Sequence, residues 1–352
     1  MLTEKQTKEI REHLDKAQNP VFYYDNDCDG LCSFLILRRY LGKGKGVAVR
    51  SYPDLNVQYA RKAKELNADY VFVLDKPVIA KGFIEEIAKL QLSLVWIDHH
   101  NIEGEDFYKD LKDFFVYNPA RNSGKEKSDE PVTYLVYKLT ERKENLWLAI
   151  IGCIADHYMP DFADRFARQY PEFWGNVLKP FDAYYKTEIG KIAQGFNFGL
   201  KDSTSNIVHL QNFLISCKGP DVVFMEMSEN YFFRKKYQEI RKKYDFLISK
   251  AHKSVDGKAI FFIYAGDVSV SADIANELSY LYPDKYIAVA YKKGIVSNIS
   301  LRGKNVKKIL INVLKKFENA SGGGHEDAVG SSIRTEDLGK FKDIFIDEVK
   351  KR

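Results

Sequence analysis

The residues best suited to chemistry lie in the segment YYDNDCDG, residues 23–30. It places three carboxylates, Asp25, Asp27 and Asp29, on alternate positions directly after the apolar run 21–24. Three acids this close repel one another when ionised, so a nearby positive charge is needed to stabilise them. The segment is open to three interpretations: a polar surface turn, a calcium loop and a catalytic metal site.

The residues that follow the acids argue against a calcium loop. Such a loop needs further oxygen ligands at fixed spacing and ends in a bidentate glutamate. Here Gly30 is followed by LCSFL, which is the apolar start of a helix. A surface turn explains aspartate and glycine, but it does not explain three acids packed against a buried strand.

Three further segments present carboxylate or imidazole groups. WIDHH brings Asp98, His99 and His100 to the end of an apolar run, and VFVLD ends in the same way at Asp75. Asp156 follows a helical pattern rich in apolar residues. Adjacent histidines at the end of a buried strand are poorly explained by core packing. Together the four segments favour a site over a turn.

The elements that carry these groups predict where the groups meet. VFYYD, VFVLD and LVWID are short apolar runs separated by helical patterns, which is typical of buried parallel strands in an α/β sheet. GVAVRSY (46–52) predicts a further strand. In such sheets ligands bind outside the carboxyl ends of the strands. Asp25, Asp75 and Asp98 are therefore expected to converge on one crevice.

The ligand types indicate divalent metal ions. Carboxylates and imidazoles without thiolates suit Mn²⁺, Mg²⁺, Fe²⁺ or Zn²⁺. The ligating groups exceed the needs of one ion, so we expect two ions about 3.5–4 Å apart. Two such ions would neutralise the acids, and a water between them would become a hydroxide able to attack phosphorus in line.

The length of 352 residues indicates two domains at about 150 residues per domain. We expect an α/β domain with a parallel sheet over 1–225, a long connecting helix over 226–252 and a smaller α/β domain over 253–352. In the last domain, strands are predicted at 259–265, 286–292 and 296–302, and helices at 272–281, 305–318 and 336–350. It also contains SGGGHEDAVG (321–330), whose glycines would let the backbone approach an anion.

The composition permits an anionic partner without requiring one, because 54 Lys and Arg against 49 Asp and Glu leave a net charge of +5. The four cysteines form no Cys-x-x-Cys pair, which indicates reduced thiols and argues against a structural zinc site. The N-terminus is a charged amphipathic helix without a signal-peptide core, and no run approaches the ~18 apolar residues of a membrane span. We expect a soluble cytoplasmic protein with no membrane partner.

In this order the motifs resemble the DHH phosphoesterase superfamily in its DHH–DHHA1 form. The resemblance covers nearly the whole chain. D-x-D-x-D-G at 25–30, Asp75, DHH at 98–100 and Asp156 are similar to its four N-terminal motifs, and SGGGH at 321–325 is similar to the GGGH signature of the DHHA1 domain. The members most similar in pattern are RecJ-like exonucleases and stand-alone phosphodiesterases, which include nanoRNases and cyclic-dinucleotide hydrolases.

The resemblance implies a metal ligand at each matching position of the first domain. The first ion would take Asp25, Asp27 and Asp75. The second ion would take Asp29, Asp75, His99 and Asp156, so that Asp75 bridges the two ions. Mn²⁺ is the expected metal, with Mg²⁺ or Co²⁺ as alternatives.

Catalytic and substrate-binding residues are implied in the same way. His100 would lie over the scissile phosphate, where it stabilises charge or protonates the leaving oxygen, and Asp98 would orient a neighbouring ligand. In the second domain the implied substrate-binding residues are Arg302, Gly322, Gly323, Gly324 and His325.

Two positions depart from the family pattern. Many members have histidine where this chain has Asp25, although RecJ-like members often have aspartate. Lys76 follows Asp75 where a small residue is common. It either neutralises part of the site or faces a phosphate, or it is an ordinary surface lysine. His157, beside Asp156, has no implied role and is interpreted as structural.

The leading prediction is a phosphodiesterase that degrades single-stranded RNA or DNA, or short oligonucleotides, to mononucleotides from an end. A cyclic-dinucleotide phosphodiesterase of the c-di-AMP type is the alternative, because it needs the same metals and the same binding patch. A non-catalytic scaffold in replication or RNA processing is a third interpretation, and the presence of all expected ligands argues against it. The charged surface of 226–252 is compatible with a homodimer or with a protein partner in a nucleic-acid-processing complex.

Overall fold

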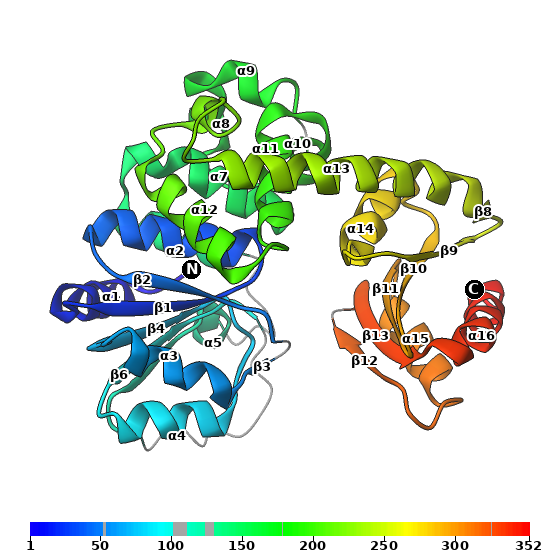
Figure 1. The fold of residues 1–352 in the computed structure, drawn as a ribbon, viewed down its shortest axis with the longest axis horizontal. Coiled ribbons are helices and arrows are strands. Elements are labelled where there is room, and N and C mark those ends of the chain that lie inside the picture. Colours follow the sequence, from blue (N-terminus) through cyan, green and yellow to red (C-terminus); the bar gives the residue numbers. More distant parts are fainter. Residues whose placement is uncertain (52–53, 101–110, 124–129, 178, 325) are drawn as a thin grey trace. The chain divides into compact units, whose positions relative to one another are not determined.

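The computed structural model describes residues 1–51, 54–100, 111–123, 130–177, 179–324 and 326–352. The chain divides into two compact units, Met1–Tyr237 and Gln238–Arg352, and the division falls within the helix α13 (Tyr231–Ala251) (Figure 1). The predicted class, an α/β domain with a parallel sheet followed by a smaller α/β domain, is confirmed. Within the described ranges, no helix combines the length and apolar character needed to cross a membrane.

The first unit is built on a five-stranded sheet in the order β2-β1-β4-β6-β7, with every neighbouring pair parallel. Its strands, with the separate short pair β3 and β5, are β1 (Pro20–Asp25), β2 (Lys45–Val49), β3 (Asp54–Leu55), β4 (Tyr70–Leu74), β5 (Val78–Ile79), β6 (Ser93–Ile97) and β7 (Phe114–Tyr117). Its helices are α1 (Glu4–Lys16), α2 (Cys28–Leu41), α3 (Ala60–Glu65), α4 (Lys81–Lys89), α5 (Pro119–Ser123), α6 (Val132–Thr140), α7 (Leu146–Ala155), α8 (Ala163–Gln169), α9 (Pro171–Trp174), α10 (Pro180–Lys186), α11 (Glu188–Gly199) and α12 (Thr204–Ser216).

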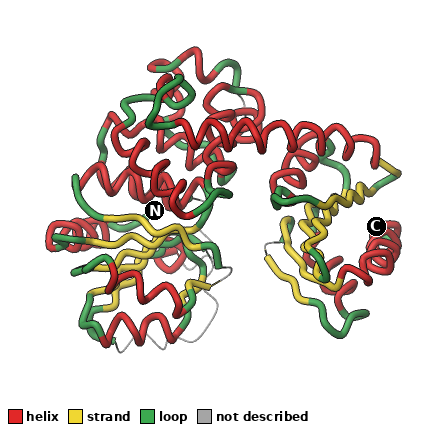
Figure 2. Tube along the Cα trace, in the orientation of Figure 1, coloured by secondary structure: helices red, strands yellow, loops and turns green. Residues whose placement is uncertain are grey.

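Helices cover both faces of this sheet, as Figure 2 shows. In β1, Phe22 and Tyr24 belong to one hydrophobic core, whereas Val21 and Tyr23 belong to the other. Successive side chains of a strand point to opposite faces, so a strand that is buried on both sides is a continuous apolar run in sequence. The apolar runs that predict parallel strands are confirmed as β1, β4 and β6.

The second unit contains a six-stranded sheet in the order β12-β13-β11-β10-β9-β8. β9 and β10 are parallel, and the other neighbours are antiparallel. The strands are β8 (Val255–Asp256), β9 (Ala259–Ala265), β10 (Tyr286–Lys293), β11 (Val296–Arg302), β12 (Ser321–Gly324) and β13 (Ala328–Arg334). The helices are α14 (Ser271–Leu281), α15 (Val306–Leu314) and α16 (Leu338–Lys350).

Three strands of the second unit were not predicted: the two-residue strand β8, and the longer strands β12 and β13. β12 consists of the residues SGGG, which carry no apolar side chain, and β13 alternates apolar with small residues. Both strands are held by antiparallel pairing with a neighbour rather than by their own propensity. The glycine run is therefore part of the sheet and lies at its edge.

Candidate active site

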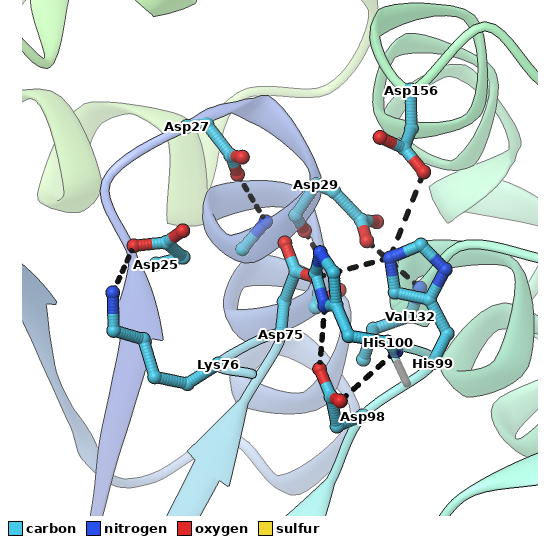
Figure 3. A network of polar contacts seen from close by, with 12 residues as sticks. Asp25, Asp27, Asp29, Asp75, Lys76, Asp98, His99, His100, Val132 and Asp156 are labelled. Carbon is cyan, nitrogen blue, oxygen red and sulfur yellow. Dashed lines mark hydrogen bonds and ion pairs between the residues drawn. The ribbon is translucent and has the colours of Figure 1, made fainter. Parts of the chain in front are cut away.

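The carboxyl ends of three adjacent strands bring the predicted acids together. β1 ends at Asp25, while Asp75 and Asp98 directly follow β4 and β6. β4 lies between β1 and β6, so neighbouring strand ends lie about 5 Å apart. Asp156 directly follows α7, and Figure 3 shows its carboxylate in the same cluster.

A tight turn between β1 and α2 sets the spacing of the first acids. Asp27 is the N-cap of α2, and its Oδ1 accepts a hydrogen bond from the Gly30 N–H at 3.0 Å. A Cβ on residue 30 would lie 2.3 Å from the carbonyl oxygen of Asp25, so only glycine fits there. Two residues of the D-x-D-x-D-G pattern therefore stabilise the turn: Asp27 caps the helix and Gly30 fits the tight backbone. The same pattern also supplies the acids of the cluster.

Asp29 is held by the start of another helix. Its carboxylate oxygens accept the Val132 N–H at 2.8 Å and the Thr133 N–H at 2.7 Å, both at the N-terminus of α6. The positive end of the helix dipole favours a carboxylate at this place. Burial and the charge of Asp156 raise the pKa of Asp29, and the bonds from Thr133 oppose that shift.

Asp75 lies in the middle of the cluster with a left-handed backbone, φ 57°, which costs about 1–3 kcal/mol in a residue other than glycine. Its carboxylate is buried, and Oδ1 has no hydrogen-bond partner among the residues that the structure describes. Burial and the charges of Asp29 and Asp27 raise the pKa of Asp75 well above its ordinary value. An orphaned, buried carboxylate oxygen is expected where a cation binds.

His99 lies between two of the carboxylates. Its Nε2 is 3.4 Å from Asp75 Oδ1 and 3.7 Å from Asp156 Oδ2. These distances are longer than the usual donor–acceptor distance of a hydrogen bond. They are close to the distance between two ligand atoms of the same ion, which is about 3 Å when each metal–ligand bond is about 2.1 Å. Two groups of three residues each place their donor atoms within 4.8 Å of one another: Asp75, His99 and His100, and Asp29, His99 and Asp156. The donor types and the orphaned Asp75 oxygen fit divalent metal ions.

Asp98 and His100 form a pair beside this cluster. Asp98 accepts the Nδ1–H of His100 at 2.9 Å and its backbone N–H at 3.0 Å. Asn118 donates to the carbonyl oxygen of His100 at 2.8 Å. Burial acts to lower the pKa of His100, but the bond to Asp98 and the charge of Asp98 raise it to about 9. The orientation of the His100 ring is therefore set by Asp98.

Lys76 is completely buried, with a side-chain exposure of 0%. Its Nζ donates to Asp25 Oδ1 at 2.8 Å and to the carbonyl oxygen of Ser51 at 2.6 Å. The interpretation of Lys76 as an ordinary surface lysine is therefore wrong. Its ammonium group neutralises part of the acid cluster, which was one of the two other possibilities that the sequence left open; the other, a contact with a phosphate, stays a prediction.

Asp27 is exposed to solvent, as is Asp156, whereas Asp29 and Asp75 are buried. Close packing of protein atoms around its carboxylate and the charges of Asp25 and Asp29 raise the pKa of Asp27 to about 7. In the metal-free protein this acid therefore binds a proton near neutral pH, and a divalent cation would displace that proton.

Sequence reasoning missed the groups that support the acids. Thr133 Oγ1 donates to the backbone carbonyl of Asp29 at 2.9 Å, and Asn118 holds His100. Neither residue lies in a recognisable motif, because each acts through contacts distant in sequence. His157, interpreted as structural, stacks its ring on that of Phe181 with centroids 4.0 Å apart.

The substrate-binding residues implied for the second unit lie at one end of its sheet. Arg302 in β11 pairs with Ala328 of the neighbouring strand β13, and Gly324 in β12 pairs with Val329 of the same strand. Arg302 and Gly324 are thus two strands apart, about 10 Å. His325 lies outside the described residues.

The three glycines of β12 differ in what requires them. A Cβ would lie 2.8 Å from the Gly330 carbonyl oxygen if placed on Gly322, and 2.6 Å from that of Ala328 if placed on Gly324. Gly324 also has φ 135°, which side chains rarely allow. A Cβ on Gly323 would meet no described atom within 4 Å. Packing requires the two outer glycines, and the backbone at Gly323 is open.

Residues 21–160 match the DHH family, N-terminal domain, and residues 252–351 match the DHHA1 domain. The chain therefore belongs to the DHH–DHHA1 superfamily, as its motifs led us to expect. No curated protein sequence matches the chain.

Solved structures share the fold at low identity. RecJ from Thermus thermophilus in complex with Mn²⁺ is 14% identical with a TM-score of 0.66, over 99% of this chain and 54% of its own, so the chain spans about half of that RecJ. An exonuclease RecJ bound to manganese is 16% identical with a TM-score of 0.64, over 100% of this chain and 96% of its own. A pGpG-specific phosphodiesterase from Vibrio cholerae is 11% identical with a TM-score of 0.51, over 95% and 99%. The shared architecture is a phosphoesterase fold.

Proposed function

We propose that the protein is a metal-dependent phosphodiesterase that removes mononucleotides from an end of single-stranded nucleic acid or short oligonucleotides. The observation that carries the proposal is the convergence of carboxylates and His99 around Asp75, whose buried Oδ1 has no hydrogen-bond partner in the described part of the chain. The fold is shared with an exonuclease RecJ that is bound to manganese, which supports Mn²⁺ as the metal.

The proposed ligands are Asp27, Asp29, Asp75, His99 and Asp156, and Asp25 lies beside them in its ion pair with Lys76. Three of them are held in place before any metal binds. Asp29 is fixed by two backbone amides, and Asp75 and His99 are fixed by burial. Two divalent ions, when bound there, would supply positive charge at the reacting phosphate and lower the pKa of water. The protein contributes preorganisation, which keeps ligand atoms close despite their repulsion.

His100 is proposed to act on the phosphate itself. Because its pKa is raised to about 9, the ring is protonated at neutral pH in the metal-free protein. A positively charged imidazole stabilises charge on a phosphate oxygen and holds a proton for a leaving oxygen. Asp98 accepts one hydrogen bond from the His100 ring and one from the His100 backbone N–H, so it is proposed to position His100.

Substrate binding is proposed for the second unit. Arg302 would bind a phosphate through its guanidinium, whose Nε already donates to Asn276 Oδ1 at 2.6 Å and is thereby oriented. Gly322, Gly323 and Gly324 would let the substrate approach the backbone of β12, above all at Gly323, where the backbone is open. His325 is proposed to take part because it directly follows these glycines.

The direct test is a panel of substrates labelled at both ends. RNA and DNA oligomers, linear dinucleotides and cyclic dinucleotides are each incubated with the protein and Mn²⁺, Mg²⁺ or Co²⁺. We expect linear strands to shorten by single nucleotides from one end, and the two labels report which end. The His99→Ala protein, purified in parallel, excludes a contaminating nuclease. If no substrate is cleaved with any of the three metals, the proposed function is wrong.

A dinucleotide or cyclic-dinucleotide phosphodiesterase is the second candidate. It is favoured by the shared fold of the pGpG-specific phosphodiesterase, which matches over nearly the full length of both chains. The same panel separates the candidates, because this enzyme would cleave dinucleotides or cyclic dinucleotides much faster than longer strands. A rate that does not fall as the strand becomes longer favours the exonuclease.

A further inference from the structure

Lys76 is a buried cation at the edge of the acid cluster. It directly follows Asp75, and its ammonium group bridges Asp25 Oδ1 and the Ser51 carbonyl at 2.8 and 2.6 Å. Its own carbonyl oxygen accepts the indole N–H of Trp96 at 2.9 Å. Both ends of the residue are therefore anchored, so the ammonium group is a fixed part of the site (Figure 3).

The two acids beside Lys76, Asp25 and Asp75, differ in the hydrogen bonds that their carboxylates accept. Asp25 Oδ1 accepts from both Lys76 Nζ and the Asn26 N–H, at 2.8 and 3.0 Å. Asp75 Oδ1 accepts from no donor in the described ranges, although it is buried. A carboxylate oxygen that already has a close ammonium partner binds a metal ion less readily, because the two cations compete for it and repel each other. The imidazole nitrogens His99 Nε2 and His100 Nδ1 lie 3.4 and 3.7 Å from Asp75 Oδ1, whereas Lys76 Nζ lies 2.8 Å from Asp25 Oδ1. Asp75 Oδ1 therefore lacks the close cationic partner that Asp25 Oδ1 has.

The charges of the cluster support this division. Asp98 is paired with His100, and Asp25 is paired with Lys76. The carboxylates that remain are Asp27, Asp29, Asp75 and Asp156, and their combined negative charge equals the positive charge of two divalent ions. If Asp25 served as a metal ligand instead, Lys76 would be a buried charge without this partner, which is costly.

We propose that Lys76 takes the place of a metal ion at Asp25 and thereby makes the two metal positions unequal. This inference rests on the proposed function, since it concerns the ions of the same site. The ion on the side of His99 would be held by Asp29, Asp75, His99 and Asp156 and would bind tightly. The ion on the side of Asp27 would have only Asp27 and Asp75 from the protein and would bind weakly.

The test measures metal binding without any substrate. Metal-free protein is titrated with Mn²⁺ by calorimetry, and free Mn²⁺ is followed by electron paramagnetic resonance. For the wild type we expect two ions whose dissociation constants differ about tenfold or more. Lys76→Met removes the charge at nearly constant volume and should tighten the weaker ion about tenfold, while the tighter ion changes little. Lys81→Met is the matched control, because Lys81 is exposed and begins the nearby helix α4.

Asp25→Asn is the second variant, and it carries the test if Lys76→Met does not fold. Since Asp25 is not a metal ligand in this proposal, the substitution should change neither Mn²⁺ dissociation constant by more than about threefold. In the Lys76→Met background the same substitution should reverse the gain in affinity, because Asp25 has then become available to the ion.

Two results would overturn the inference. One is a Lys76→Met protein whose weaker ion is not tightened, and a higher KM for phosphodiester in that variant would then assign Lys76 to the substrate. The other is an Asp25→Asn protein that loses Mn²⁺ affinity by about tenfold or more, as a true ligand would. These measurements do not depend on catalysis. A wild-type protein with two unequal ions that cleaves no phosphodiester would contradict the proposed function alone.

Discussion

The two units hold their candidate functional groups in opposite ways. In the first unit Asp29, Asp75 and His99 are almost completely buried, and they are crowded by charges and backbone amides. In the second unit Arg302 is only partly buried and the backbone at Gly323 is open. Ligands that must hold metal ions need a rigid, desolvated arrangement, because their mutual repulsion would otherwise separate them. A surface that binds a flexible anion needs only one oriented cationic side chain and a backbone that the anion can reach.

The largest expected effect comes from removing a ligand of the first unit. His99→Ala should lower the rate of phosphodiester cleavage by ~10³-fold, because the ring is a proposed metal ligand that lies between Asp75 and Asp156. Single-turnover rates in Mn²⁺ measure this effect, and circular dichroism checks that the fold is intact. A folded variant that cleaves phosphodiesters at a near-normal rate would contradict the two-metal assignment.

Replacing a glycine by alanine should change the free energy of unfolding differently in the two units. Gly30→Ala would force a Cβ to within 2.3 Å of the Asp25 carbonyl oxygen, so we expect a loss of about 2–3 kcal/mol in the free energy of unfolding. Gly339→Ala, in α16 of the second unit, is the matched control because a Cβ there meets no described atom within 4 Å. It should leave stability unchanged or raise it by up to ~1 kcal/mol. Urea unfolding of the metal-free protein measures the free energy of unfolding of both variants. Equal losses of stability would contradict the difference in packing around Gly30 and Gly339.

In the second unit, Arg302→Ala should raise KM about tenfold and change kcat much less, because the proposed contact to a phosphate would be lost while the proposed metal site is untouched. Arg334→Ala provides the control, since Arg334 is at the opposite end of the neighbouring strand β13, where it pairs with Val296. Steady-state kinetics on a short oligonucleotide separate the two constants. An unchanged KM for Arg302→Ala would remove the proposed substrate-binding role of this unit.

The smallest expected effect is a pH dependence that arises at Asp27. Its pKa is raised to about 7 in the folded protein and lies near 4 in an unfolded chain, so the folded protein binds more protons between these values. The stability contributed by Asp27 is therefore fully present below about pH 4 and is lost as the pH rises to about 7. Asp27→Asn should become more stable relative to wild type across this range.

Thermal unfolding in the presence of a chelator measures this difference. Added Mn²⁺ should reverse the trend for the wild type, because metal binding requires the deprotonated carboxylate. A stability difference between Asp27→Asn and wild type that does not change with pH would show that Asp27 ionises normally.

Much of this architecture could be predicted from local pattern. Apolar runs that end in acids indicate strands buried on both faces, and β1, β4 and β6 follow them closely. The strand β12 could not be predicted, because its glycines carry no β signal and pair only when a neighbouring strand is already in place. The supporting bonds from Thr133 and Asn118 were missed for the same reason, since they join segments distant in sequence.

The sequence by itself determined that acids and histidines follow three buried strands and a helix, and hence that they meet at one edge of a parallel sheet. It also indicated that a helix starts after Gly30, although the lack of room for a side chain at that glycine is seen only in the structure. Only the tertiary structure decided which acid still needs a cation. Burial and contacts assign Lys76 to Asp25 and leave Asp75 Oδ1 with no hydrogen-bond partner among the described residues. The physical reason is that desolvation and pairing depend on atoms brought together from distant segments, and a local motif contains no information about them.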